Sequence, residues 1–249
     1  MKILLLLLFI QTAWAAPAAR LETDPELTAG YYEGDMLMDS QQRNGVRNES
    51  LRWPDRVVLY HINSNIDAAH RNHILLGLQI LELNSCLRFK AADISRDTYY
   101  VNVTSEDGGC FSYVGFRDQV QQLNLQYYPL DTGCYRLGTI VHEFLHALGF
   151  YHQHSSSDRD DYVRIAKEYI LDGKESNFNK YNETVVDEYD QIYDYGSVMQ
   201  YTAYAFSKNG EMTIVPLKEG AEQQMGQRLQ MSQSDIKKLN VMYKCPQRV

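Results

Sequence analysis

The sequence has no block of basic residues, no internal repeat and no long apolar run after its first ten residues. Its formal net charge is −8, so neither nucleic acid nor an anionic membrane surface is expected as the main partner. A transmembrane helix needs about 18 apolar residues, and no segment beyond the N-terminus approaches that length, so no membrane anchor is expected. The absence of repeats also argues against a structural matrix protein. A composition of 44% hydrophobic and 22% charged residues over 249 positions predicts one globular domain plus processing segments.

The N-terminus has the features of a secretory signal. Lys2 is followed by an apolar run over residues 3–10 and then by Ala13, Trp14 and Ala15, a small-x-small cleavage pattern. We therefore expect residues 1–15 to be a signal peptide and the protein to be secreted to the extracellular space.

The cysteines and glycosylation motifs agree with secretion. Four cysteines are few but even in number, and in an oxidising compartment they predict two disulfides whose pairing the residues alone leave open. The acceptor pattern Asn-x-Ser/Thr predicts a glycoprotein. These residues are Cys86, Cys110, Cys134 and Cys245, with acceptors at Asn48, Asn102 and Asn182.

The segment from Val141 to His152 contains the pattern H-E-x-x-H-x-x-G-x-x-H. His142 and His146 are four residues apart, so on a helix both imidazoles lie on one face and are able to hold one Zn²⁺. Gly149 allows the helix to end in a left-handed turn, after which the chain reverses and brings in His152 as the third ligand. Three protein ligands leave a coordination position open, which is typical of a catalytic site. Glu143 is placed to take a proton from a zinc-bound water.

A bare H-E-x-x-H pattern also arises when surface histidines pair by chance. Gly149 and His152 at their spacing make that alternative much weaker. His70 and His73 lack both the i,i+4 spacing and a third partner, so we interpret them as surface or packing residues.

The alternation of apolar residues predicts an α+β fold, in which a twisted mixed sheet with packed helices forms the N-terminal half. The C-terminal half is expected to be irregular apart from one helix, with the active-site cleft between the halves. Residues 16–43 show little periodicity and are expected to be an extended pro-segment. The predicted strands are 56–62, 87–91, 99–104, 110–114 and 123–127. One helix is predicted to begin at Asn65 or Asp67, and two further helices are predicted at 138–148 and 232–243.

A second block, Tyr193-Asp194-Tyr195-Gly196-Ser197-Val198-Met199-Gln200-Tyr201, completes a resemblance to the astacin family of metzincin proteases. The resemblance runs from the pro-segment to Cys245. It implies that Met199 is the apolar floor of the metal site, in the family's Met-turn. It also implies that Tyr201 contacts zinc in the free enzyme and stabilises the oxyanion of the transition state, a role that suits a phenol.

The same resemblance extends to Tyr32-Glu33-Gly34-Asp35, which is similar to the family's Phe-x-Gly-Asp signature with Tyr in place of Phe. It implies that Asp35 binds zinc in place of water and silences a zymogen, and that an activating protease cuts near Arg43. The protease domain would then span residues 44–249. The implied disulfides are Cys86–Cys245 and Cys110–Cys134.

Two positions depart from the family pattern. Gln153 stands where the family usually has a Glu that receives the new N-terminal ammonium, which predicts weaker dependence of activity on accurate trimming. Gln200 stands where a His is common, which puts the local packing in doubt. His154 is additional and is expected to face solvent.

We therefore predict a secreted, zinc-dependent endopeptidase that is made as a zymogen and hydrolyses protein or peptide substrates. The alternative is a secreted protease homologue without activity that binds partners. Gln153 and Gln200 are its only support, because Glu143 and all three histidines are retained.

Overall fold

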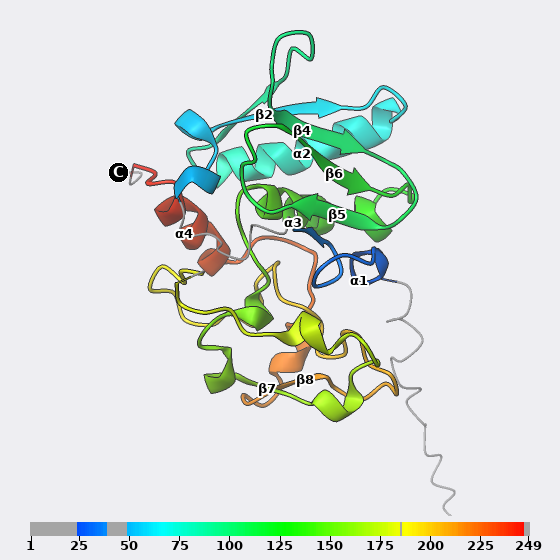
Figure 1. Cartoon of the computed structure of the whole chain (residues 1–249), viewed down its shortest axis with the longest axis vertical. Helices are drawn as coiled ribbons and strands as arrows, with labels where there is room; N and C mark the ends of the chain where they lie inside the picture. Colours follow the sequence, from blue (N-terminus) through cyan, green and yellow to red (C-terminus); the bar gives the residue numbers. More distant parts are fainter. Residues whose placement is uncertain (1–23, 39–48, 185, 247–249) are drawn as a thin grey trace, which may run out of the picture.

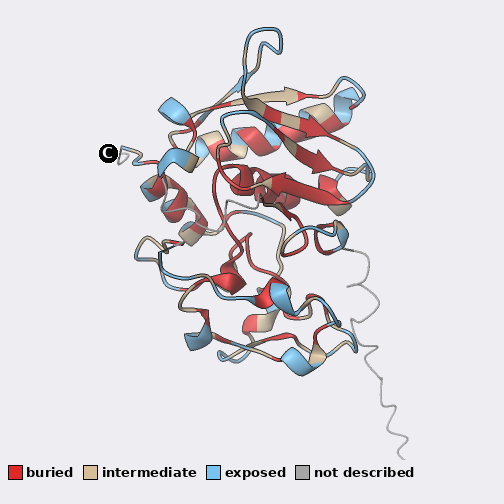
Figure 2. Ribbon diagram, viewed as in Figure 1, coloured by how far each residue is buried: buried red, intermediate tan, exposed pale blue. Residues whose placement is uncertain are grey.

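The computed structural model describes residues 24–38, 49–184 and 186–246. The expected signal peptide, Arg43 and Asn48 lie outside these residues. In Figure 1 the sheet and the helices α2 and α3 form the upper part of the molecule, and mostly irregular chain forms the lower part. Each part has its own cluster of buried apolar side chains, and Figure 2 shows the buried residues concentrated in the sheet and α3.

The upper part is built on one six-stranded mixed sheet with the strand order β1-β5-β6-β4-β2-β3. All neighbouring strands are parallel except β5 and β6, which run antiparallel. This arrangement confirms the predicted α+β class. The strands are β1 (Met36–Leu37), β2 (Val57–Ile62), β3 (Arg88–Ala91), β4 (Tyr100–Thr104), β5 (Cys110–Tyr113) and β6 (Val120–Leu125).

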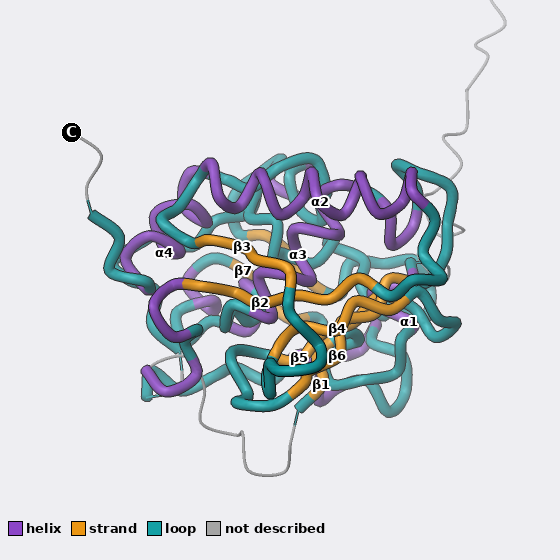
Figure 3. The backbone as a smooth tube through the Cα atoms, turned by 90° about the horizontal axis from the view of Figure 1, so that it is seen from above, coloured by secondary structure: helices purple, strands orange, loops and turns teal. Residues whose placement is uncertain are grey.

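Two helices, α2 (Ala68–Leu83) and α3 (Leu137–Ala147), pack against each other and against the sheet (Figure 3). Asp67 begins α2, because its carboxylate accepts the N–H groups of Ala69 and His70. Gly77 permits the close contact with α3, since a Cβ at this position would lie 2.7 Å from the Cγ2 of Ile140. Every residue of α3 from Gly138 to Ala147 is buried, so this helix is the centre of the upper core.

The lower part has one two-stranded antiparallel sheet, formed by β7 (Val163–Ile165) and β8 (Ile214–Pro216), among many short 3₁₀ turns. Its apolar cluster includes Phe178, Tyr201 and Ile214. The last helix, α4 (Gln233–Met242), begins with a capping box of Ser232 and Asp235. None of the helices in the described ranges has the length and apolar composition needed to cross a membrane.

Most predicted elements are present, and two details differ. Strand β6 begins at Val120, three positions before the predicted start. Residues 24–38 are not simply extended, because they contain the short helix α1 (Pro25–Thr28) and add β1 to the edge of the sheet. His70 is buried, with its Nδ1 2.6 Å from Asp67 and its Nε2 3.0 Å from the carbonyl of Tyr128, which confirms a packing role.

Candidate metal centre

Helix α3 holds two of the three predicted ligands and its end directs the third. Gly149 has φ 109°, and its N–H donates to the carbonyl of His146 while the N–H of Phe150 donates to that of Leu145. These two bonds form a Schellman motif, which ends the helix and reverses the chain. His152 is thereby returned to the ring pair of His142 and His146, as predicted.

The imidazoles of the three histidines converge through their Nε2 atoms. The Nε2 atoms of His142 and His146 are 3.1 Å apart, and all three rings are buried. Asp35 completes the group, with carboxylate oxygens 3.2 Å from the Nε2 of His142, 3.6 Å from that of His146 and 3.3 Å from that of His152. Together these four residues form a cluster able to hold one metal ion.

In each ring the hydrogen-bond partner of Nδ1, the outer nitrogen, determines whether Nε2, the inner nitrogen that faces the centre, carries a proton. The Nδ1 atoms of His142 and His146 lie 2.9 Å and 2.8 Å from the carbonyl oxygens of Val198 and Phe150, which only accept. Each Nδ1 therefore carries the proton, and each Nε2 presents a lone pair to the centre. Facing lone pairs repel unless a cation lies between them. This donor set fits Zn²⁺, and the neutral imidazoles and one carboxylate match its preferred ligands.

Asp35 is brought to the centre by a tight turn in residues 31–36. Tyr31 and Gly34 exchange two backbone hydrogen bonds, and Gly34 has φ 90°. A Cβ on Gly34 would lie 2.6 Å from the carbonyl oxygen of Glu26, so glycine is required by space as well as by conformation. The N–H of Ser112 in β5 donates to the carbonyl of Asp35 and fixes this segment against the sheet.

Glu143 and Tyr201 border the histidine cluster with unpaired polar atoms. Both carboxylate oxygens of Glu143 and the hydroxyl of Tyr201 are buried without a hydrogen-bond partner among the described residues. Burial, and then the charge of Asp35, raise the pKa of Glu143 and of Tyr201, so the phenol stays protonated and able to donate. The Tyr201 ring lies 4.4 Å from the His152 ring, measured between centroids.

The segment expected to form the Met-turn contacts the centre and is fixed by α4. Met199 is buried, and its carbonyl accepts the N–H of Gln153. The carboxylate of Asp235 accepts from Ser197 Oγ at 2.6 Å and from the N–H of Val198 at 2.9 Å. Val198 in turn supplies the carbonyl that orients His142, so Asp235 acts on this predicted ligand through the backbone.

The residues that depart from the family pattern have defined partners. Gln200 is buried; its Oε1 accepts from the Tyr193 hydroxyl at 2.6 Å and its Nε2 donates to the carbonyl of Tyr201, so the packing around this residue is well satisfied. The prediction that His154 faces solvent is wrong, because irregular chain covers it: the ring is fully buried, stacks on Tyr201 and bonds to the carbonyl of Asn177.

Gln153 is paired with a buried lysine. Its Oε1 accepts from the Nζ of Lys238 at 2.8 Å, and Lys238 also pairs closely with the carboxylate of Glu188. All three side chains line one pocket behind His152. The site expected to receive an N-terminal ammonium therefore already contains an internal one.

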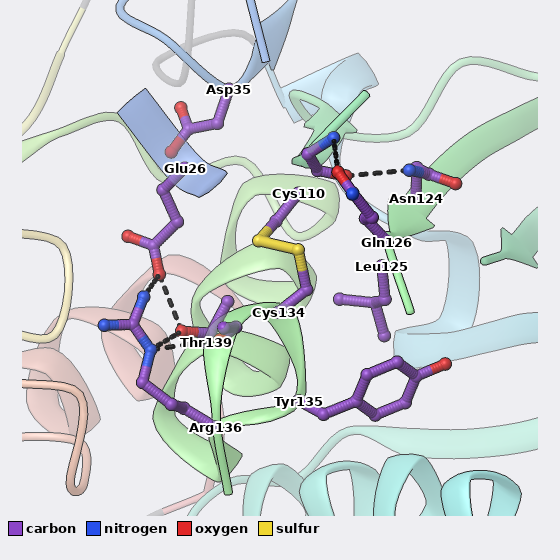
Figure 4. Close-up of a disulfide and its surroundings, with 12 residues drawn as sticks. Glu26, Asp35, Cys110, Asn124, Leu125, Gln126, Cys134, Tyr135, Arg136 and Thr139 are labelled. Atoms are coloured by element: carbon purple, nitrogen blue, oxygen red, sulfur yellow. Dashed lines mark hydrogen bonds and ion pairs between the residues drawn. A yellow bond between two sulfur atoms is a disulfide. The ribbon is translucent and has the colours of Figure 1, made fainter. Parts of the chain in front are cut away.

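A second carboxylate anchors residues 24–38 beside the centre. Glu26 is 1% exposed and receives Arg228 through Nε at 2.8 Å and a terminal nitrogen at 2.6 Å. Arg136 and the hydroxyl of Thr139 also donate to it, at 3.1 Å and 2.6 Å, as Figure 4 shows. Burial alone would raise the pKa of Glu26, but the charges around it, that of Arg228 first, outweigh burial and lower the pKa.

Two disulfides close the domain around this centre. Cys110 pairs with Cys134 and joins β5 to the segment before α3 (Figure 4), and Cys86 pairs with Cys245. Both pairs are those that the resemblance implies. Glu26, Arg228 and Glu33 received no role from the sequence. Of these residues, only Glu33 could have been found from the sequence, because it lies two positions before Asp35 in the motif of the expected pro-segment.

Comparisons with known proteins agree with this geometry. The family model for astacin, a family of peptidases, matches residues 45–244. The chain is 46% identical over 235 residues to Seminal metalloprotease 1 of Drosophila melanogaster, covering 93% of each chain. It is 40% identical to Meprin A subunit beta of Homo sapiens over 215 residues, which are 86% of this chain and 30% of that protein.

A solved structure has the same arrangement of elements. High choriolytic enzyme 1, a hatching enzyme zinc-protease from Oryzias latipes (medaka fish), matches with a TM-score of 0.71 at 33% identity, covering 80% of this chain and 97% of that chain. Family model, relatives and fold lead to one assignment. The chain belongs to the astacin family and is a metalloendopeptidase.

Proposed function

We propose that this protein is the secreted zymogen of a zinc-dependent endopeptidase, with His142, His146 and His152 as metal ligands. The single observation that carries this proposal is the convergence of the three Nε2 atoms on one point, together with the unpaired carboxylate of Glu143. The predicted signal peptide is the basis for secretion. The alternative of an inactive binding homologue has no matching observation, because every group that hydrolysis needs is retained in one buried cluster.

In this proposal the zinc ion, when bound, supplies a Lewis acid for the attacking water and the scissile carbonyl. Glu143 accepts the proton of the attacking water and later passes it to the leaving amine. The hydroxyl of Tyr201 donates a hydrogen bond to the carbonyl oxygen as negative charge develops there. Met199 and Val198 hold the floor of the centre, and His142 is oriented through the Val198 carbonyl.

The zymogen state is supported by residues 24–38. Asp35 lies within hydrogen-bond or ion-pair distance of all three ligand rings, where it excludes water from the centre. Strand β1 pairs with β5, the edge strand to which an extended substrate would otherwise add. Glu26 holds the segment in place through two arginines. Cleavage near Arg43 would free all three contacts.

The test is peptide hydrolysis by the purified zymogen before and after cleavage near Arg43. Activity is expected only after cleavage, to vanish with a chelator and to return with added Zn²⁺. A folded, zinc-loaded and trimmed protein that hydrolyses no peptide in a broad substrate library would contradict the proposal and favour the binding homologue. Activity that is equal before and after cleavage would contradict the proposed zymogen but not the proposed endopeptidase.

A further inference from the structure

The third histidine differs from the other two in what orients it. The Nδ1 atoms of His142 and His146 bond to carbonyls of the protease domain, Val198 and Phe150. The Nδ1 of His152 instead lies 2.8 Å from the carboxylate of Glu33, which is 119 positions earlier in the chain and inside the expected pro-segment. This one ring is therefore oriented by a residue that activation would remove.

The position of Glu33 is fixed by burial and by hydrogen bonds. Its side chain is 0% exposed, and its second carboxylate oxygen accepts from the hydroxyl of Ser155 at 2.9 Å. Its own N–H donates to the Oδ1 of Asn177 at 3.2 Å. Two residues of the lower part thus bind this one residue of the segment.

The backbone at Glu33 is also strained. Its φ is 46°, in the left-handed region that a residue with a side chain seldom adopts, at a cost of about 1–3 kcal/mol. The surrounding contacts maintain that conformation, and its result is that Glu33 and Asp35 both direct carboxylates at the histidine cluster. The Glu33 carboxylate contacts the Nδ1 of His152, and the Asp35 carboxylate contacts the Nε2 atoms that face the centre.

We propose that Glu33 is a positioning residue for metal binding by the zymogen: it fixes His152 as a ligand and tightens zinc binding while the pro-segment is attached. This inference rests on the proposed zinc site. A carboxylate that accepts the outer N–H of a ligating imidazole fixes its orientation and makes it a stronger donor. Glu33 and Asp35 together also balance the two charges of Zn²⁺ inside a buried site, where an unbalanced charge is unfavourable.

The pro-segment therefore has two opposite effects on one centre. Asp35 blocks access to the metal, whereas Glu33 strengthens the metal's hold on the protein. Zinc is bound before activation and held most tightly at that stage. Removal of the segment leaves the Nδ1 of His152 without this acceptor, so the mature enzyme releases zinc faster than its precursor.

The test measures zinc binding by the full zymogen, through competition with a chromophoric chelator. Glu33→Ala is expected to raise the dissociation constant about 10–100-fold. Glu33→Gln keeps an acceptor oxygen without the charge, and a charge-assisted bond is roughly twice as strong as a neutral one, so its rise is expected to be smaller. Leu27→Ala is the matched control, because Leu27 is a buried residue of the same segment that packs in the lower apolar cluster and belongs to no metal-ligand group.

A visible spectrum with Co²⁺ in place of zinc gives a second readout, which reports on the coordination of the metal itself. The absorption bands are expected to shift in Glu33→Ala and to stay unchanged in Leu27→Ala. A dissociation constant for Glu33→Ala within about twofold of the wild type, or an equal rise in Leu27→Ala, would overturn the inference. If Glu33→Ala does not fold, an unchanged constant and spectrum in Glu33→Gln would overturn it. A wild-type zymogen that binds no zinc would instead overturn the proposed function itself.

Discussion

The upper and lower parts of the molecule bring residues to the same centre by different physical means. In the upper part, backbone ladders and one buried helix set the positions of His142, Glu143 and His146. In the mostly irregular chain after His152, short turns are held by individual side chains, such as the Asp235 carboxylate that accepts from Ser197 and Val198. A single substitution should therefore change chemistry without structure in the upper part, and structure together with chemistry in the irregular chain.

The sharpest test of this contrast is Glu143→Ala. The helix around Glu143 does not depend on its carboxylate, which has no hydrogen-bond partner in the described part of the chain. Turnover by the trimmed enzyme is expected to fall about 10²–10⁴-fold, because a general base contributes that much. The midpoint of thermal unfolding and the zinc content, measured by calorimetry and metal analysis, should remain those of the wild type. Substantial residual turnover would show that another group takes the proton.

Asp235→Ala addresses the opposite case. It removes three bonds to one buried carboxylate, from Ser197, Val198 and Ser232, and a loss of about 3 kcal/mol in the free energy of unfolding is expected. Zinc affinity should fall as well, because the Val198 carbonyl orients His142. Lys237→Ala, an exposed change in the same helix, serves as the control and should stay within about 0.5 kcal/mol in denaturant unfolding. Equal stability of the two variants would remove the distinction between the two parts.

The same contrast explains what the sequence was able to predict. Helix α3 follows from its apolar residues, its i,i+4 histidines and Gly149, because local spacing determines a helix and its end. Sequence spacing did not predict the pairing of Glu26 with Arg228, which lie 202 positions apart and meet only in the folded chain. His154 was predicted incorrectly for a related reason. Polar residues in irregular chain have no periodicity, so their burial depends on which segment covers them.

The contacts that Glu26 makes to anchor residues 24–38 are tested next. Glu26→Gln keeps the shape of the side chain but removes the charge that Arg228 and Arg136 bind, and the zymogen is expected to lose about 2 kcal/mol of stability at pH 7. The pKa of Glu26 is lowered in the folded state from the ordinary value of 4.5, so its contribution is fully present above that value. As pH falls below 4.5 the contribution is lost.

The difference in unfolding free energy between wild type and Glu26→Gln should therefore be constant between pH 7 and about 5 and narrow at lower pH. Denaturant titrations at several pH values measure it. A difference that widens as pH falls would mean that Glu26 is protonated in the zymogen and that the two arginines bind it only weakly.

The smallest expected effect concerns Gln153, where the two parts meet behind His152. In this chain Lys238 of α4 already provides an ammonium to Gln153, and Glu188 balances its charge. A new N-terminus has little to gain at this position, so one extra N-terminal residue should change the turnover of the wild type by no more than about threefold. Gln153→Glu restores a charged acceptor, and a charge-assisted bond is about twice as strong as a neutral one. The turnover of this variant should therefore depend more strongly on accurate trimming of the N-terminus. Peptide hydrolysis by precisely trimmed and extended forms of both proteins measures the coupling. If one extra residue abolishes activity in the wild type, Lys238 does not substitute for the N-terminus, and the irregular part depends on activation for its structure.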